Sequence, residues 1–439
     1  MAGSRLGILA DGVPVIGGCI LRMDSPLSYI YPDAYDEVTL IKGPQSVAKG
    51  AGLSAGVVEF KRRKPVFEKP GIRFDGAALF GSFGRNDQMS EVLAGNAQWH
   101  GRVSGTRSES QSYKDGKGRR VHSAWQRWSG DVALGWTPDA RTRLELSGGA
   151  SDGQADYADR HSDAIRLHRS HWTLKLEKEA ISPLLKRVDA YIYRQHTHHV
   201  MDNYSRRAIH PSWNGILMVM NPQNRIRAER VSVDLEPARD VLLKIGLDHQ
   251  HTQTHDRMAM FYPAMVGRPG LPPDVVYRNT TDYHRIPLKK YHDATQTGLF
   301  SEWQWPLDAQ NLQRMAGGLR LDRAKMQLPS VKAATRRTLR SGFIRYERDI
   351  ENGGSFYAGI GHSQHFPDYW EYIWIHNRTG GATYASLKPE RLTQLDVGIS
   401  VQKERWNAKI SGFYGRTKDF ILIHWRPQTF VENIDIISN

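Results

Sequence analysis

Apolar and polar positions alternate with a period of two along most of the chain from about residue 72 onward. Clear examples are residues 241–247 and 395–401, in which every second residue is Val, Leu or Ile. This period places alternate side chains on opposite faces of an extended strand, so these segments are predicted β-strands with two unlike faces. Counting such segments predicts about 16 strands.

Short and long connections take turns between these predicted strands. Residues 137–141 and 351–354 are short and rich in turn-forming residues, whereas residues 198–224 and 253–291 are long, polar and partly aromatic. Tight turns at one end and long loops at the other are typical of an up-and-down transmembrane β-barrel. Aromatic residues near the predicted strand ends fit girdles at the two membrane interfaces. The pattern therefore predicts an all-β fold, an antiparallel transmembrane β-barrel.

The segment before residue 69 lacks this alternation. It is rich in Gly and Pro and contains short apolar pieces at residues 6–9, 38–41 and 57–60. This composition predicts part of a small mixed α/β domain, and a barrel of about 20 strands needs its lumen filled. We therefore expect residues 1–68 to form a partial plug domain and residues 72–439 an incomplete barrel.

Composition excludes several other classes of protein. The chain has 60 Lys and Arg against 46 Asp and Glu, a formal net charge of +14, but its longest basic run is only Lys61-Arg-Arg-Lys64, so we expect no nucleic-acid partner. The apolar residues 216–220 fall far short of the roughly 20 needed for a membrane-spanning helix. One cysteine rules out an intramolecular disulfide framework or a Cys-rich metal site. No recognisable catalytic arrangement is present, so we expect no enzyme.

Three segments near the start of the chain carry a family resemblance. They read Asp11-Gly-Val-Pro14, Tyr35-Asp-Glu-Val-Thr-Leu-Ile-Lys-Gly-Pro-Gln-Ser46 and Gly50-Ala-Gly-Leu-Ser-Ala-Gly-Val-Val58. In this order they resemble the plug signature of TonB-dependent receptors. The resemblance implies a transporter in the bacterial outer membrane, surrounded by its lipid, with the TonB complex of the inner membrane as partner.

Further segments resemble the TonB-dependent copper receptors more narrowly. They are Gly18-Cys-Ile-Leu-Arg-Met-Asp-Ser-Pro26, His199-Val-Met-Asp-Asn-Tyr-Ser205, Gly361-His-Ser-Gln-His-Phe-Pro-Asp-Tyr-Trp-Glu371 and Leu387-Lys-Pro-Glu390 with Gln394-Leu-Asp-Val397. The signal peptide, the TonB-contacting box and the first part of the plug have no counterpart before residue 8, and relatives have about 22 strands. We therefore expect a fragment lacking both ends, with an unclosed sheet.

This resemblance implies that copper is the transported ligand and that Cys19, Met23, His199 and Met201 hold it. His199 and Met201 lie two apart on a predicted extended segment, so their side chains share a face. Thiolate, thioethers and imidazole form a soft donor set that favours copper(I) over zinc, iron or calcium. His198 could replace His199, and the sequence leaves this open.

Three interpretations of function follow. The first is uptake of copper, as Cu(I), through ligands shared by the plug and an extracellular loop. The second is a TonB-dependent receptor for a ferric siderophore or another metal chelate. The third is a truncated fragment that is nonfunctional or only sequesters metal. Further methionines in the next long connections, such as Met218 and Met220, are interpreted as adaptable packing between loops.

Overall fold

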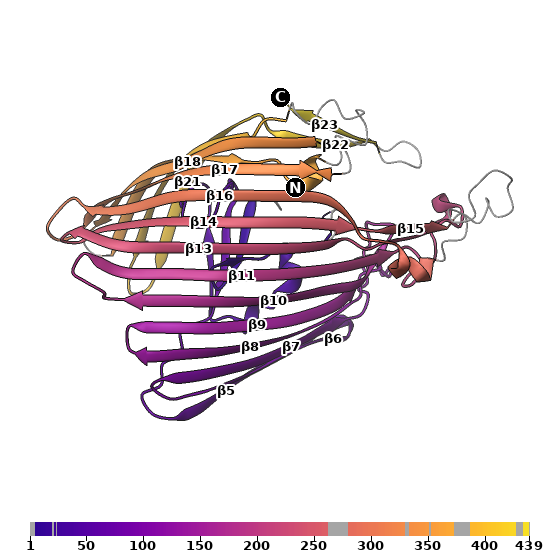
Figure 1. Cartoon of the computed structure of the whole chain (residues 1–439), viewed down its shortest axis with the longest axis horizontal. Coiled ribbons are helices and arrows are strands. Elements are labelled where there is room, and N and C mark those ends of the chain that lie inside the picture. Colours follow the sequence, from indigo (N-terminus) through magenta and orange to yellow (C-terminus); the bar gives the residue numbers. More distant parts are fainter. Residues whose placement is uncertain are drawn as a thin grey trace.

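The computed structural model of this chain describes residues 5–19, 22, 24–261, 280–329, 333–350, 353–372, 387–426 and 433–438. Most of these residues belong to one antiparallel sheet of 17 strands, which we call the wall (Figure 1). This architecture confirms the predicted all-β barrel. No helix among the described residues has the length and apolar character to cross a membrane.

The wall strands are mostly 11 to 18 residues long. They are β5 (Gly71–Gly81), β6 (Arg85–Gly95), β7 (Trp99–Ser110), β8 (Trp125–Asp139), β9 (Thr142–Ala155), β10 (Asp163–Glu179), β11 (Leu185–Asp202), β12 (Leu217–Met220), β13 (Gln223–Ala238), β14 (Val241–Asp256), β15 (Met258–Phe261), β16 (Lys289–Pro306), β17 (Gln313–Leu328), β18 (Ala333–Ile350), β19 (Gly354–His365), β20 (Glu390–Gln402) and β21 (Asn407–Lys418). The four-residue strands β12 and β15 pair with each other in the loop region, so 15 long strands remain, close to the predicted number.

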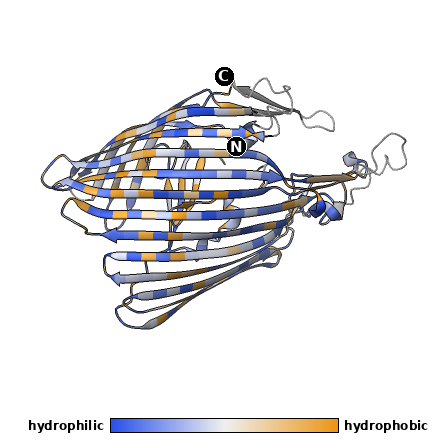
Figure 2. Ribbon diagram, in the orientation of Figure 1, coloured by the Kyte–Doolittle hydropathy of each residue, from blue (hydrophilic) through white to orange (hydrophobic). Residues whose placement is uncertain are grey.

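Alternation along the strands gives the wall two different faces. On β17, Leu319 and Leu321 are 71% and 51% exposed, whereas the intervening Arg320 is buried. Figure 2 shows this alternation as hydrophobic and hydrophilic positions that follow one another along the strands. An outward apolar face with a polar lumen is the pattern that a lipid-embedded barrel requires.

The strand order closes on itself through β21 and β5. The sequence predicted an unclosed sheet, and the closed strand order corrects this. This junction differs from the others, which are ladders of paired residues such as Trp99↔Trp136 between β7 and β8. The described residues of β21 and β5 share no such ladder, and both strands are exposed along nearly their whole length.

A second sheet lies inside the wall (Figure 1). It has the order β2-β1-β4-β3 and contains β1 (Leu6–Ala10), β2 (Val13–Pro14), β3 (Glu37–Ile41) and β4 (Gly56–Lys61). Strands β1 and β4 are parallel and the other pairs are antiparallel. The inner sheet ends at Lys61 and the wall begins at Gly71. We propose that the boundary between the two domains lies between residues 68 and 72. Residues 5–68 are called the plug below.

The described residues also include short helices, a helical turn at residues 369–372 and several 3-10 helices. Two belong to the plug, η1 (Pro26–Tyr29) and η2 (Pro32–Ala34), and each begins at a proline, whose fixed φ suits a first helical position. The others are η3 (Ser82–Gly84), η4 (Pro211–Trp213) and η6 (Thr280–Arg285). Strands β22 (Ile421–Arg426) and β23 (Asn433–Ser438) form a separate hairpin.

Hydrogen bonds and apolar contacts attach the plug to the wall. Glu302 of β16 accepts bonds from the hydroxyl of Ser46 (2.7 Å) and from the backbone N–H groups of Val47 (2.7 Å) and Ala48 (2.8 Å). Elsewhere a buried cluster joins plug residues such as Ile8 and Tyr29 to Leu167 of β10. Plug and wall therefore share one packed interior.

Candidate metal site

Cys19 lies in the loop between β2 and η1, and the carboxylate of Asp24 organises this loop. The backbone N–H groups of Gly18 and Cys19 donate to the two oxygens of Asp24 at 2.6 and 2.7 Å, and the hydroxyl of Tyr29 donates to Oδ2 as well. A buried carboxylate needs several such donors. The loop is thereby folded around Asp24, with the side chain of Cys19 8% exposed.

Two wall side chains dock this loop through its backbone. Gln195 of β11 donates to the carbonyl of Ile16 (2.8 Å), and Asn224 of β13 donates to the carbonyl of Gly17 (2.7 Å). The close approach depends on Gly18, because a Cβ there would lie 3.2 Å from the Cβ of His199. A glycine at this point lets the plug backbone come close to the wall.

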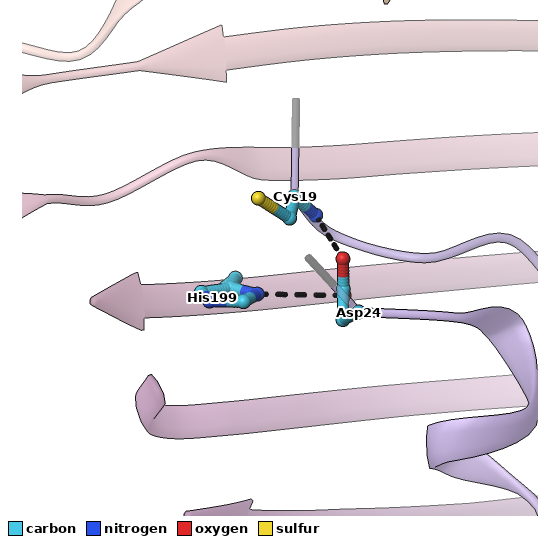
Figure 3. A group of neighbouring side chains, drawn as sticks. All are labelled: Cys19, Asp24 and His199. Carbon is cyan, nitrogen blue, oxygen red and sulfur yellow. Dashed lines mark hydrogen bonds and ion pairs between the residues drawn. The ribbon is translucent and has the colours of Figure 1, made fainter. Parts of the chain in front are cut away.

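His199 of β11 completes a compact group of donor atoms. The candidate ligand atoms of Cys19, Asp24 and His199 all lie within 4.8 Å of one another, and Oδ2 of Asp24 is 3.4 Å from Nδ1 of His199 (Figure 3). His199 is fully buried, and while Nδ1 faces Asp24, Nε2 has no hydrogen-bond partner among the described residues. A buried polar atom without a partner costs about 1–3 kcal/mol, and a bound ion would remove that cost.

Met201 lies two residues further along the same face of β11 and is 0% exposed. The sequence placed His199 and Met201 in an extracellular loop, and this was wrong, because β11 continues through Asp202 and pairs with β10 at both residues. It belongs to one buried apolar cluster with Cys19, Met220 and Met326, and its sulfur is 3.9 Å from the hydroxyl of Ser162. The buried cluster therefore combines the thiol of Cys19 with thioethers from three wall strands, and Cys19 belongs both to this cluster and to the group that contains His199. Met23 lies outside the described residues.

Strand parity separates His199 from its neighbour His198. Residues Tyr193, Gln195, Thr197 and His199 point inward and are buried, whereas His198 points to the other face and is only partly buried. Cys19 and Asp24 approach from inside the wall, so the histidine that the structure brings to them is His199.

The electrostatics of the group centre on Asp24. Burial by itself would raise the pKa of Asp24, but the neighbouring imidazole of His199 and the hydrogen bonds from Tyr29 and Gly18 outweigh it and lower the pKa below its usual value. Burial, followed by the charge of Asp24, raises the pKa of Tyr29. The carboxylate therefore stays ionised and the phenol stays a donor, which is the state that holds the loop.

Sequence reasoning overlooked Asp24. It stands inside the segment that carries the resemblance, one residue after Met23, but a lone Asp before Ser25 and Pro26 is equally typical of a helix start. The only signal was its proximity in sequence to Cys19. Its role depends on a fold in which Asp24 turns back onto the backbone of residues 18 and 19.

A second group of donor atoms is explained without an ion. His122, Asp156 and Asp163 also lie within 4.8 Å of one another. However, Arg206 binds Asp156 and Arg207 binds Asp163, so both carboxylates already have cationic partners. We interpret this group as a network that ties neighbouring loops together.

A cavity of about 560 Å³ lies between plug and wall, and Cys19 and Asp24 form part of its lining. Its other walls include Arg230, Arg320 and Trp370. The candidate metal site therefore borders a space larger than one ion.

Comparison with known proteins places the chain in a family. The family described as "TonB dependent receptor-like, beta-barrel" matches residues 105–435. No curated protein matched the chain.

Solved structures show the same architecture. The copper transporter OprC is 34% identical, with 99% of this chain and 69% of that chain covered and a TM-score of 0.91. The FrpB iron transporter from Neisseria meningitidis is 18% identical, with coverage of 95% and 66% and a TM-score of 0.71. The ferric yersiniabactin uptake receptor FyuA from Yersinia pestis is 14% identical, with coverage of 95% and 64% and a TM-score of 0.63. The last two are similar in fold alone.

Family match, fold and sequence identity agree on the class of protein. Members of this class are outer-membrane transporters and not enzymes, as the sequence predicted. The chain therefore belongs to the TonB-dependent receptor family.

Proposed function

We propose that this chain is a copper-uptake receptor whose ligand, Cu(I), is bound by Cys19, His199 and Met201, with Met23 as a further ligand from the same plug loop. The observation that carries the proposal is the buried group in which the donor atoms of Cys19 and His199 lie within 4.8 Å of one another, next to the cluster containing Met201. Sulfur and imidazole ligands suit Cu(I). The similarity to a protein named as a copper transporter supports the same conclusion.

The division of the site suggests how binding and transport are coupled. Cys19 is on the plug, whereas His199 and Met201 are on β11 of the wall. An ion bound between them holds the two parts together, and a displacement of the plug separates its ligands. Force from the TonB complex of the inner membrane would in this way release copper inward.

Asp24 acts as a positioning residue in this proposal. Its oxygens already accept bonds from Gly18, Cys19 and Tyr29, and Oδ2 faces Nδ1 of His199. A carboxylate beside one ring nitrogen orients the imidazole and leaves Nε2 for the metal.

A receptor for a ferric siderophore or another metal chelate is the second candidate. The cavity between plug and wall favours it, because about 560 Å³ is enough for a small organic ligand and Arg230 forms part of its lining. Arginine forks bind the carboxylates of such chelates. Copper uptake is the better supported function because the candidate metal site offers sulfur and nitrogen donors, while the oxygens of Asp24 already accept hydrogen bonds from the plug.

Titration of the purified chain with Cu(I) in the presence of a competing chelator tests the proposal. We expect Cys19→Ala and His199→Ala to weaken binding by about tenfold or more. The matched control is His198→Ala, which removes the adjacent imidazole from the opposite face of β11 and should leave affinity unchanged. Equal affinities for wild type and Cys19→Ala would overturn the copper assignment, and binding of a ferric chelate by the same sample would favour the second candidate.

A further inference from the structure

Two exposed histidines from different loops lie against each other at the end of the wall that carries the long connections. His161 belongs to the connection between β9 and β10, and His210 belongs to the connection between β11 and β12. Their ring centroids are 4.8 Å apart, and the ring planes are inclined to each other by 55°. We call these two residues the histidine pair. They are far apart in the sequence, so only the fold brings them together.

Two consecutive arginines fix the loops that carry the histidine pair. Arg206 donates to the carboxylate of Asp156 at 2.5 Å. Arg207 donates to the carboxylate of Asp163 and to the carbonyl of Tyr157, both at 2.7 Å. These bonds run from the β11–β12 connection to the β9–β10 connection and its junction with β10. The histidine pair is therefore preorganised, which lowers the entropic cost of binding one ligand with both side chains.

Each ring keeps a nitrogen that a ligand can use. Nδ1 of His210 lies 2.7 Å from the hydroxyl of Ser212 in η4, and this contact leaves Nε2 available. His161 forms no hydrogen bond or ion pair with the residues that the structure describes. Metal-binding histidines commonly hold the ion with one nitrogen and a hydrogen-bond partner with the other, which is the arrangement that His210 has with Ser212.

The separation of the two rings fits an ion held by both of them. With metal–nitrogen bonds of about 2.0 Å, each centroid lies about 3 Å from the ion, so rings bound at angles of about 90–110° have centroids about 4.5–5 Å apart. The observed 4.8 Å falls in this range. A linear arrangement of two nitrogens, as in two-coordinate Cu(I), needs about 6 Å. The spacing therefore favours a four-coordinate divalent ion.

We propose that the histidine pair is a second metal site, which binds a divalent ion with affinity for imidazole, Cu(II) or Zn(II), while water completes the coordination. Imidazole nitrogen suits both ions. The pair is exposed, whereas the adjacent Ser162 is buried with its hydroxyl 3.9 Å from the sulfur of Met201. The second site therefore lies further out than the candidate metal site. It shares no ligand with that site, so the inference does not rest on the proposed function.

The test uses the full chain in detergent with the substitution Cys19→Ala, which removes the thiol of the candidate metal site. The probe is copper(II) sulfate without a reductant. Electron paramagnetic resonance counts the imidazole nitrogens on the ion, and titration against a competing chelator gives the affinity. We expect the signal of an ion with two imidazole ligands. A signal with one imidazole, or no bound Cu(II), would overturn the inference and would leave the Cu(I) titration of the unaltered chain unaffected.

Single substitutions in the same background test whether both histidines bind one ion. Joining two binding groups on one scaffold raises affinity by about 10²–10⁴-fold, so His161→Ala and His210→Asn should each weaken Cu(II) binding by about 100-fold. Asn is chosen because it preserves the cap that His210 provides for η4. The double variant should lose little more, since a single remaining imidazole no longer chelates the ion.

The matched control is His284→Ala, which removes another exposed histidine, in η6, and should leave the affinity unchanged. Circular dichroism checks that all variants keep the β-fold. Small, additive losses from the two substitutions in the histidine pair would mean that the two rings bind separately. Such losses, or an equal loss in His284→Ala, would contradict the inference.

Discussion

Asp24 of the plug lies with Oδ2 3.4 Å from Nδ1 of His199 on the wall. The same carboxylate accepts the backbone N–H of Cys19, so one side chain joins the loop that carries the thiol to the strand that carries the imidazole. This relationship makes Asp24 the central positioning residue of the candidate metal site.

Replacement of Asp24 by Asn should weaken Cu(I) binding by about 10- to 100-fold, the usual effect of losing the partner that orients a metal-binding histidine. The amide has one oxygen in place of two, so it cannot accept from Gly18 and Cys19 as well as from Tyr29. Competition titration measures the affinity. Asp33→Asn, in an exposed part of the plug, is the control. Unchanged affinity in Asp24→Asn would show that the carboxylate does not position the ligands.

The pH dependence of stability should report on Asp24. Although burial would raise its pKa, His199 and the hydrogen bonds from Tyr29 and Gly18 lower it, so the ionised form is favoured in the folded state. A carboxylate with a lowered pKa stabilises the fold above its unfolded value of about 3.9, and this stabilisation is lost as the pH falls through the folded-state pKa.

We therefore expect stability to persist from pH 7 to about pH 4 and to fall below that. Thermal unfolding across this range measures it, and Asp24→Asn should lose part of the acid-dependent decrease. If Asp24→Asn and wild type decrease in parallel, other carboxylates account for the acid sensitivity.

Met201→Leu should separate sulfur chemistry from packing. Leucine fills a similar volume, so the buried cluster should lose less than about 1.5 kcal/mol of stability while one thioether ligand disappears. We expect weaker Cu(I) binding with a nearly unchanged melting temperature. Met89→Leu on β6, far from the site in the strand order, serves as the matched control. A Met201→Leu protein with full affinity would remove Met201 from the ligand set.

Glu302→Gln should loosen the plug from the wall. Glu302 accepts three hydrogen bonds from residues 46–48, and weakening charge-assisted bonds of this kind costs about 1.5–3 kcal/mol. Amide hydrogen exchange at Val47 and Ala48 should accelerate. Glu229→Gln, which changes a carboxylate that pairs with Arg227 on β13, is the control. Identical exchange in Glu302→Gln and wild type would mean that these bonds do not hold the plug.

Gly361→Ala should disturb the contact between plug and wall by steric overlap. A Cβ at Gly361 would lie 2.2 Å from the carbonyl oxygen of Pro44, so the plug backbone would have to move. Overpacking of this kind costs about 1–3 kcal/mol, which lowers the melting temperature. Gly101→Ala, on β7 with nothing within 4 Å of the added carbon, provides the comparison. Equal melting temperatures for the two variants would contradict the close approach.

Local patterns were enough to predict the barrel and part of its site. Segments such as residues 395–401 are recognisable as strands because one face of each strand meets lipid and the other meets the interior. Apolar and polar residues therefore alternate along the sequence. Cys19, His199 and Met201 were recognisable for a similar reason, since they stand within short segments that resemble known receptors. Their role as ligands stays a prediction.

Other features depend on how distant segments meet in space. Alternation alone does not reveal which face of β11 turns toward the plug, because both His198 and His199 are polar. The contact with Cys19 and Asp24 selects His199, since the plug enters from inside the wall. The role of Asp24 depends on its contact with His199, which is far away along the chain. The closure of the wall likewise depends on β5 and β21, which are distant in sequence. Such long-range contacts leave no periodic trace in the sequence, which is why they required the folded molecule.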